Sequence, residues 1–114
     1  MNPEAIFRLM DNRISMLSKK ENDVALLGEE YVKSKREYAK EKAKKMFLLK
    51  NDKVPMAIIG DLVRGDKVIS DLRFKRDLSK IKYEACKSEV YNIRLEIEVC
   101  RSKLAYLKEE LKSV

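Results

Sequence analysis

The sequence predicts an all-α fold: a long antiparallel two-helix hairpin, that is, a coiled coil, with a short helical tip. Apolar residues recur in a seven-residue pattern from Ile69 to Val114, which keeps one face of a helix against a partner helix. Only two Pro and three Gly occur in 114 residues, so few turns are expected. Two arms of similar length flank a single Pro-containing breaker. We therefore expect one hairpin over residues 1–114, with an arm at 3–50, a tip at 51–66 and an arm at 67–113.

The first arm begins with a helix-start signal. Asn2 suits a cap, Pro3 the first helical position, and Glu4 the first turn. The polar run 19–23 and Gly28 weaken the middle of this arm, since Gly costs roughly 1 kcal/mol against Ala inside a helix. The two arms nevertheless match in length, at 48 and 47 residues, which predicts a continuous first helix. One column of its apolar stripe contains Leu17, Val24, Tyr31 and Tyr38 at seven-residue spacing. The complementary column of the same pattern is less apolar, since it contains Glu21, Gly28, Lys35 and Lys42.

The tip starts at a breaker, residues 51–55, where Asn, Asp and Pro favour a turn. We expect a short helix over residues 56–64, closed by Gly65 in the left-handed conformation, after which Asp66 caps the second arm. The tip also carries five apolar residues with two interpretations. They either plug the open end of the hairpin or form an exposed patch that binds a partner protein. These residues are Met56, Ile58, Ile59, Leu62 and Val63.

The second arm has a regular apolar seam and a second apolar row. Its seam positions are Ile69, Leu72, Arg76, Ser79, Tyr83, Cys86, Val90, Ile93, Ile97, Cys100, Leu104, Leu107, Leu111 and Val114, with Arg76 and Ser79 as the only breaks. The second row contains Phe74, Leu78, Ile81 and Ala85, and it continues more thinly at Leu95, Val99 and Tyr106. Two apolar faces on one helix are difficult to bury in a lone hairpin. They favour a homodimer in which two hairpins form a four-helix assembly.

The net charge of +7 is concentrated in the middle of the sequence. Residues 40–82 contain thirteen Lys or Arg and six Asp or Glu, whereas the remaining residues contain thirteen of each. A basic column follows the second arm at Arg73, Lys80, Lys87, Arg94, Arg101 and Lys108. It either pairs with first-arm acids such as Glu29, Glu30, Glu37 and Glu41 or contributes to a stripe that contacts phosphates. The candidate nucleic-acid contacts are Lys40, Lys42, Lys44, Lys45, Arg64, Lys67, Arg73, Lys75, Arg76, Lys80 and Lys82.

The sequence contains no recognisable catalytic, cofactor-binding or metal-binding constellation. His is absent, and no Gly-rich loop joins a strand to a helix. Cys86 and Cys100 are fourteen residues apart on one helix, or ~21 Å, which excludes a bridge between them and disfavours a zinc site. They are expected as reduced core residues or, alternatively, as interchain partners. No signal peptide or membrane span is apparent, so we expect a non-enzymatic cytoplasmic protein.

Two stretches carry a resemblance to a known group of proteins. The stretches are EEYVKSKREYAKEKAKKMFLL, from Glu29, and DLRFKRDLSKIKYEACKSEVYNIRLEIEVCRSKLAYLKEEL, from Asp71. Together with the breaker between them, they resemble small helical-hairpin proteins encoded by bacteriophages and prophages. The resemblance implies a cytoplasmic phage accessory protein of the kind found beside recombination or replication genes, and it implies no catalytic residues.

The predicted function is a non-enzymatic phage accessory protein that acts by protein–protein interaction in phage DNA replication or recombination. Its partners would be a second copy of the chain and a host or phage protein. One alternative is an accessory protein that binds nucleic acid without sequence preference through the basic loop end. Another is an assembly chaperone that clamps a coiled coil of a different protein.

Overall fold

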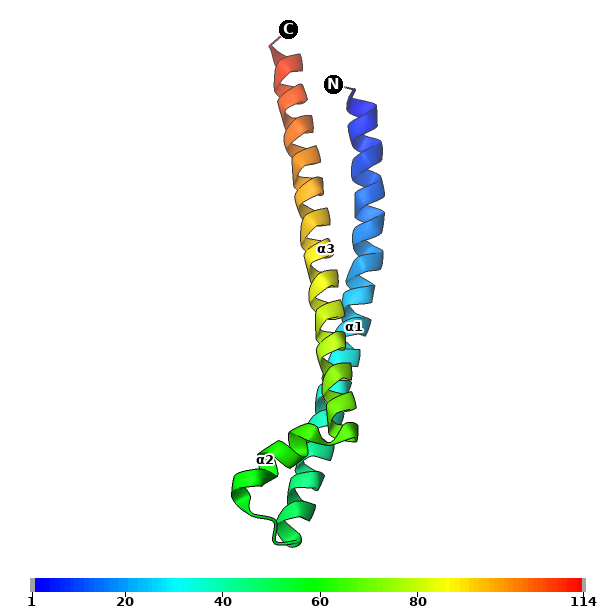
Figure 1. The fold of residues 1–114 in the computed structure, drawn as a ribbon. Helices are drawn as coiled ribbons and strands as arrows, with labels where there is room; N and C mark the ends of the chain where they lie inside the picture. The colour runs from blue at the N-terminus through cyan, green and yellow to red at the C-terminus, as the bar shows by residue number, and fades with distance from the viewer. Residues whose placement is uncertain (1, 114) are drawn as a thin grey trace. The chain divides into compact units, whose positions relative to one another are not determined.

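The computed structural model describes residues 2–113 and contains three helices, α1 (Pro3–Asn51), α2 (Met56–Gly65) and α3 (Lys67–Lys112) (Figure 1). No strand occurs in this range, so the predicted all-α class is confirmed. The chain divides into two compact units. Unit 1 comprises Met1–Ala25 with Glu84–Val114, and unit 2 comprises Leu26–Tyr83. In each unit a segment of α1 packs antiparallel to a segment of α3.

The helix α1 is continuous, as the matched arm lengths predict. Its start is capped by Asn2, whose Oδ1 accepts a hydrogen bond from the backbone N–H of Glu4 at 3.0 Å. The helix runs without a break through the polar run and through Gly28. A Cβ placed on Gly28 would lie 3.4 Å from Cε1 of Tyr83, so this glycine lies directly against the Tyr83 ring.

The end of α1 is a Schellman turn closed by Lys53. Lys53 has a φ of 61° and is the one residue with positive φ in the described range. Its N–H bonds to the carbonyl of Lys50 at 3.0 Å, and the N–H of Val54 bonds to the carbonyl of Leu49 at 3.1 Å. The prediction of a left-handed Gly65 is therefore wrong. Gly65 remains helical, and the chain leaves α2 through Asp66 in an extended conformation, at φ −65° and ψ 130°.

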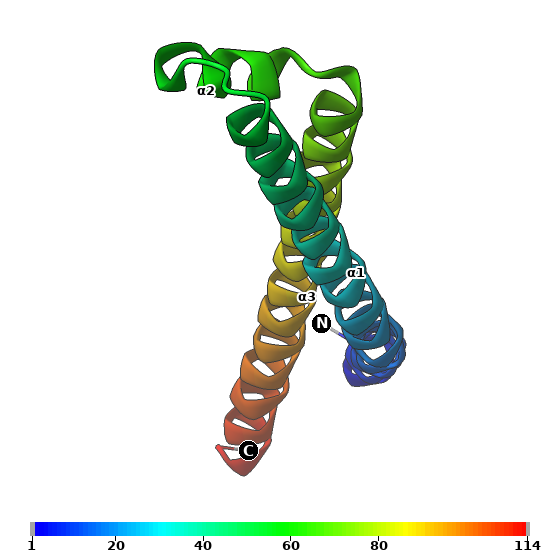
Figure 2. The ribbon, with the colours of Figure 1, turned by 90° about the horizontal axis from the view of Figure 1, so that it is seen from below.

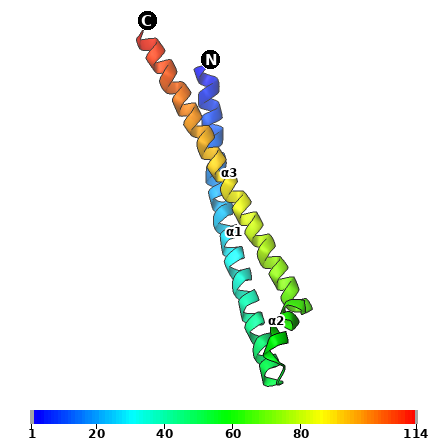
Figure 3. The ribbon, with the colours of Figure 1, turned by 60° about the vertical axis from the view of Figure 1, so that its left-hand side comes forward.

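The helix α2 supplies the core of unit 2. Ile59 and Val63 are each only 3% exposed and pack with the buried Ile69 at the start of α3. Four half-buried residues complete this cluster: Tyr38, Met46, Leu49 and Val54. Figure 3 shows α2 folded back beside the last turns of α1, and Figure 2 shows how it joins the end of α1 to the start of α3. Asp66 caps α3 as predicted, because its Oδ1 accepts from the N–H of Ile69 at 3.1 Å.

The buried stripe of α3 follows the predicted seam. Every seam position from Ile69 to Leu107 is buried or half-buried. All other residues in this range are exposed, except Ser70 and Arg73, which are half-buried. The two polar breaks remain in the seam. Ser79 is buried, and the guanidinium carbon of Arg76 lies 4.4 Å from the centre of the Tyr38 ring. The seven-residue pattern therefore identified the buried face of α3 as far as Leu107. The predicted seam residue Leu111 is 75% exposed, and Val114 lies outside the described residues.

The buried stripe of α1 differs from the expected one. Leu17, Val24, Tyr31 and Tyr38 are half-buried, as expected, but three of their four predicted complementary residues are exposed and only Gly28 is half-buried. The second column of the stripe consists instead of Ile6, Arg13, Lys20, Leu27, Ser34 and Glu41. Four of these six side chains are polar or charged. An apolar pattern cannot indicate this column, because Arg13 and Lys20 are held in it by carboxylates of α3. Ser34 and Glu41 instead bond within α1.

Candidate interaction site

The five apolar tip residues divide between two faces of α2. Ile59 and Val63 belong to the core, as the plug interpretation expects. Met56 is 69% exposed, and Ile58 and Leu62 are also exposed, so these three form an apolar surface as the patch interpretation expects. Both interpretations therefore describe part of the tip. Of these five residues, only Met56, Ile58 and Leu62 contribute to the exposed apolar surface of α2.

The second apolar row of α3 lies at the surface. In unit 2, Phe74 and Ile81 are 69% and 65% exposed, and Leu78 between them is exposed as well. Such large apolar side chains at helical spacing are the kind of contiguous patch that proteins use for association. In unit 1, the continuation of the row lines an open groove on the outer surface of α3. The groove residues are Leu95, Glu98, Val99, Ser102, Lys103 and Tyr106.

Unit 2 carries the whole net charge of the protein. Its sequence contains sixteen Lys or Arg and nine Asp or Glu, which gives +7, whereas unit 1 contains ten of each. All eleven candidate nucleic-acid contacts belong to unit 2. The loop end therefore has the charge expected for binding an anionic partner.

Ion pairs engage some of these basic residues and leave others unpaired. Five are paired, namely Lys44 with Glu41, Lys45 with Asp66, Arg64 with Asp61, Lys75 with Glu37 and Arg76 with Asp77. Within residues 2–113, four form no ion pair or hydrogen bond: Lys40, Lys67, Lys80 and Lys82. The remaining two make other contacts. Lys42 Nζ lies 5.7 Å from the centre of the Tyr38 ring, and Arg73 donates to the Arg64 carbonyl at 3.3 Å.

The basic column of α3 pairs mainly along its own helix. Arg94 is a member that pairs across to α1, and its partner is Glu21 at 3.0 Å. Arg101 pairs with Glu98, and Lys87 pairs with Glu84. Among the expected first-arm acids, Glu37 does reach α3, but it pairs with Lys75 rather than with the column. Glu29 and Glu41 pair with lysines of α1.

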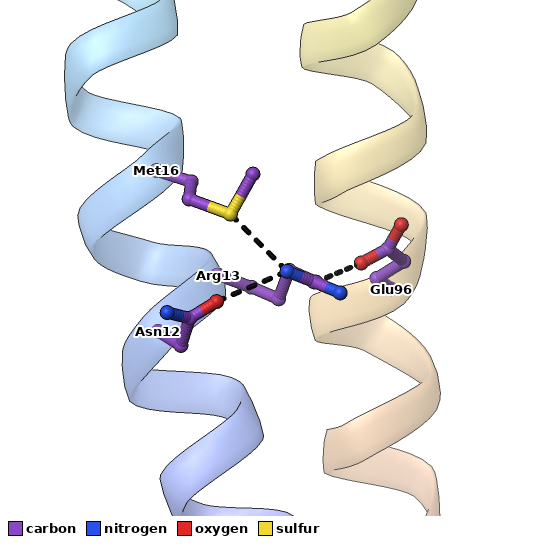
Figure 4. A network of polar contacts seen from close by, with 4 residues as sticks. All are labelled: Asn12, Arg13, Met16 and Glu96. Atoms are coloured by element: carbon purple, nitrogen blue, oxygen red, sulfur yellow. Dashed lines mark hydrogen bonds and ion pairs between the residues drawn. The ribbon is translucent and has the colours of Figure 1, made fainter.

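Two cross-helix ion pairs replace apolar contacts in the seam of unit 1. Arg13 of α1 pairs through Nε with Glu96 of α3, and its Nη1 lies 3.0 Å from Asn12 Oδ1 and 3.1 Å from Met16 Sδ (Figure 4). One heptad later, Lys20 pairs with Glu89 at 2.6 Å. The numbers rise on α1 as they fall on α3, which is the antiparallel order. Sequence reasoning missed both pairs, although the seven-residue spacing of Arg13 and Lys20 matches that of Glu89 and Glu96.

Within the described part of the chain, burial or neighbouring groups shift the pKa of four side chains. The hydrogen bond and charge of Glu89 raise the pKa of Lys20. The backbone N–H of Ile69 lowers the pKa of Asp66, and Lys45 contributes in the same direction. Asp77 raises the pKa of Arg76. Burial raises the pKa of the Cys86 thiol, which therefore remains neutral near pH 7.

The cysteines and carboxylates are the side chains with metal-binding chemistry in this sequence, which contains no His. Cys86 and Cys100 are both buried free thiols, as the core interpretation expects. Within residues 2–113, no group of three or more Cys, Asp or Glu side chains is placed to hold a metal ion. Within the same range, no helix contains a stretch that is long and apolar enough to cross a lipid bilayer.

No protein-family model, curated protein or solved structure matches this chain.

Proposed function

We propose that this protein is a non-enzymatic interaction protein whose first partner is a second copy of itself. The observation that carries the proposal is the exposed row of Phe74, Leu78 and Ile81 on α3. This row is regular and apolar, yet neither α1 nor α2 covers it. Two hairpins that pair through it would bury it in a four-helix assembly.

The size of the row supports a weak dimer. Burying the exposed part of each of three such side chains contributes about 1–2 kcal/mol, so two copies together gain about 6–12 kcal/mol. Association costs on the order of 4–15 kcal/mol. The two amounts are comparable, which favours a concentration-dependent dimer that one charged substitution abolishes.

Light scattering over a wide range of protein concentration tests this proposal. We expect the mass to rise from the 13.3 kDa of the monomer towards twice that value. Ile81→Glu should keep the protein monomeric without unfolding it, because the Ile81 side chain is exposed. The exposed Ala39 on α1 provides a matched control, since Ala39→Glu adds the same charge outside the row. A monomeric wild-type protein at every concentration would overturn the proposal.

The tip supports a second partner within the same function. We propose that Met56, Ile58 and Leu62 bind a host or phage protein in the host cytoplasm, in phage DNA replication or recombination. The support is the exposed apolar surface of α2 together with the resemblance of the sequence to phage hairpin proteins. Capture from host lysate by the wild-type protein should be lost with Leu62→Asp and retained with Asp61→Asn. Equal capture by Leu62→Asp would exclude the tip.

Sequence-independent nucleic-acid binding is the second candidate function. It is favoured by the unpaired Lys40, Lys67, Lys80 and Lys82 in a unit of net charge +7. Binding through phosphates should weaken steeply with salt, with a slope of log K against log salt of about −0.7 to −0.9 per phosphate contacted. Mobility-shift measurements with single- and double-stranded DNA at two salt concentrations test it. An absence of binding at low salt would exclude this function.

A further inference from the structure

A small pocket lies in unit 2 where α1, α2 and the start of α3 meet. Its volume is about 190 Å³. The deep part of its lining is apolar and consists of the half-buried Met46 and the buried Val63 and Ile69. Three basic side chains also line it, namely the exposed Lys42 and Arg64 and the half-buried Arg73. The pocket therefore combines an apolar floor with a cationic rim.

No acidic residue compensates the rim within the lining of the pocket. Among residues 2–113, Lys42 forms no ion pair, and Arg73 donates its hydrogen bond to the backbone carbonyl of Arg64. Arg64 pairs with Asp61 at 3.6 Å, but both side chains are largely exposed, so this pair is weak. Basic side chains that line one pocket repel each other, which raises the electrostatic free energy of the empty pocket. An anion bound between these side chains would lower that free energy.

The floor of the pocket selects among anions. An inorganic phosphate needs polar partners on every side. Apart from the three basic side chains, Tyr38 is the one polar side chain in the lining, and Met46, Val63 and Ile69 offer a phosphate no partner. A ligand that carries a carboxylate next to an aliphatic side chain matches both parts of the pocket, because the carboxylate pairs with the basic side chains and the aliphatic group packs on the apolar floor. Gly60 also lines this space, and no atom lies within 4 Å of the position that its Cβ would take, so an incoming side chain has room.

We propose that this pocket binds an acidic amphipathic helix of a partner protein. One aliphatic side chain of the partner would enter the floor, and carboxylates three or four residues away would pair with Lys42 and Arg73. The proposal rests on the interaction role proposed above and specifies the chemistry of the partner at the tip. It does not depend on dimerisation through Phe74 and Ile81.

Fluorescence anisotropy with a labelled helical peptide tests the proposal. The probe carries Leu and Glu at four-residue spacing, and its controls replace every Glu by Gln or every Leu by Ala. We expect binding of the first peptide, and at least a tenfold loss with either control, because each control removes one half of the match. A labelled single-stranded oligonucleotide forms the competing arm.

Variants of the protein locate the binding. Lys42→Gln and Arg73→Gln should each weaken peptide binding about tenfold, as expected for the loss of a charge-assisted contact. The matched Lys40→Gln, which removes an unpaired lysine of α1 outside the pocket, should change it less than about twofold. Gly60→Leu should abolish binding by filling the pocket, and circular dichroism should show that its helices remain.

Several outcomes would overturn the proposal. These are equal binding of the Gln-substituted peptide, no effect of Lys42→Gln, or binding of the oligonucleotide without binding of any peptide. Light scattering on the same samples separates this result from the proposed dimer. A dimeric protein that ignores the acidic peptide refutes the pocket alone, whereas a monomer that binds the peptide refutes only the dimer.

Discussion

Gly28 offers a direct test of how closely α1 and α3 approach in unit 2. Glycine inside a helix costs about 1 kcal/mol relative to alanine, because it loses more backbone freedom on folding. A Cβ at Gly28 would lie 3.4, 3.5 and 3.7 Å from three atoms of the Tyr83 ring, which are ordinary contact distances. The new methyl group therefore fits without moving the ring. We expect Gly28→Ala to raise the free energy of unfolding by about 1 kcal/mol.

Urea and thermal unfolding followed by circular dichroism measure this change. For a chain of this size, about 1 kcal/mol corresponds to roughly 4 °C in Tm. The protein concentration must be held constant, because association makes Tm depend on it. Gly60→Ala is the matched control. It changes another helical glycine, but its Cβ would meet no atom within 4 Å, so it isolates the helix-propensity gain.

A larger side chain at Gly28 should have the opposite effect. Gly28→Val adds branches beyond a Cβ that already touches the Tyr83 ring, and it should destabilise the protein by about 1–3 kcal/mol. The reasoning fails if Gly28→Ala itself destabilises the protein while Gly60→Ala stabilises it. That result would mean that α1 and α3 approach too closely at this position to accommodate a methyl group.

Three further predictions concern the turn, the cap and the polar seam. Lys53→Gly should stabilise the protein by about 1 kcal/mol in urea unfolding, since Gly adopts the left-handed conformation without strain. The pKa of Asp66 is lowered in the folded state, so its contribution to stability is present above pH 3.8 and is lost as the pH falls through the folded pKa. Asp66→Asn keeps a cap but should remove this pH dependence, so its urea midpoint should fall below that of the wild type at pH 7 and match it in strong acid. Lys20→Glu should lower the urea midpoint by placing two carboxylates together, and Lys20→Glu combined with Glu89→Lys should restore it. If the double variant is no more stable than Lys20→Glu, the pair does not contribute to the seam.

The seam of α3 was predictable from sequence, whereas that of α1 was only half predictable. On α3 the buried positions are mostly apolar, so their spacing appears directly in the sequence. On α1 one column contains Arg13, Lys20 and Glu41, which look like surface residues. Arg13 and Lys20 lie in the seam because Glu96 and Glu89 of α3 neutralise them there. Such pairs join residues about seventy to eighty positions apart, so no local pattern indicates them.

The tip was also only partly predictable from local sequence. The breaker, the short helix and the Asp66 cap follow from local residue chemistry, and the structure has all three. Local chemistry also suggested Gly65 for the left-handed position, because glycine adopts it most easily. The position falls on Lys53 instead, where the Schellman turn lets Val54 join the core cluster. Which face of α2 becomes buried depends on this docking, and composition alone could not separate Ile59 from Ile58.

The contrast between the two units bears most directly on function. In unit 1, cations and carboxylates meet across the hairpin, as Arg94 meets Glu21 and Lys20 meets Glu89. In unit 2, Lys75 meets Glu37 in the same way, but Lys42 and Arg73 line one pocket from α1 and α3, and no carboxylate lies in its lining. One heptad along each helix, the next residues of these two columns are Lys35 and Lys80, which are also basic and exposed. An acidic partner of the kind proposed would supply the carboxylates that the lining of this pocket lacks.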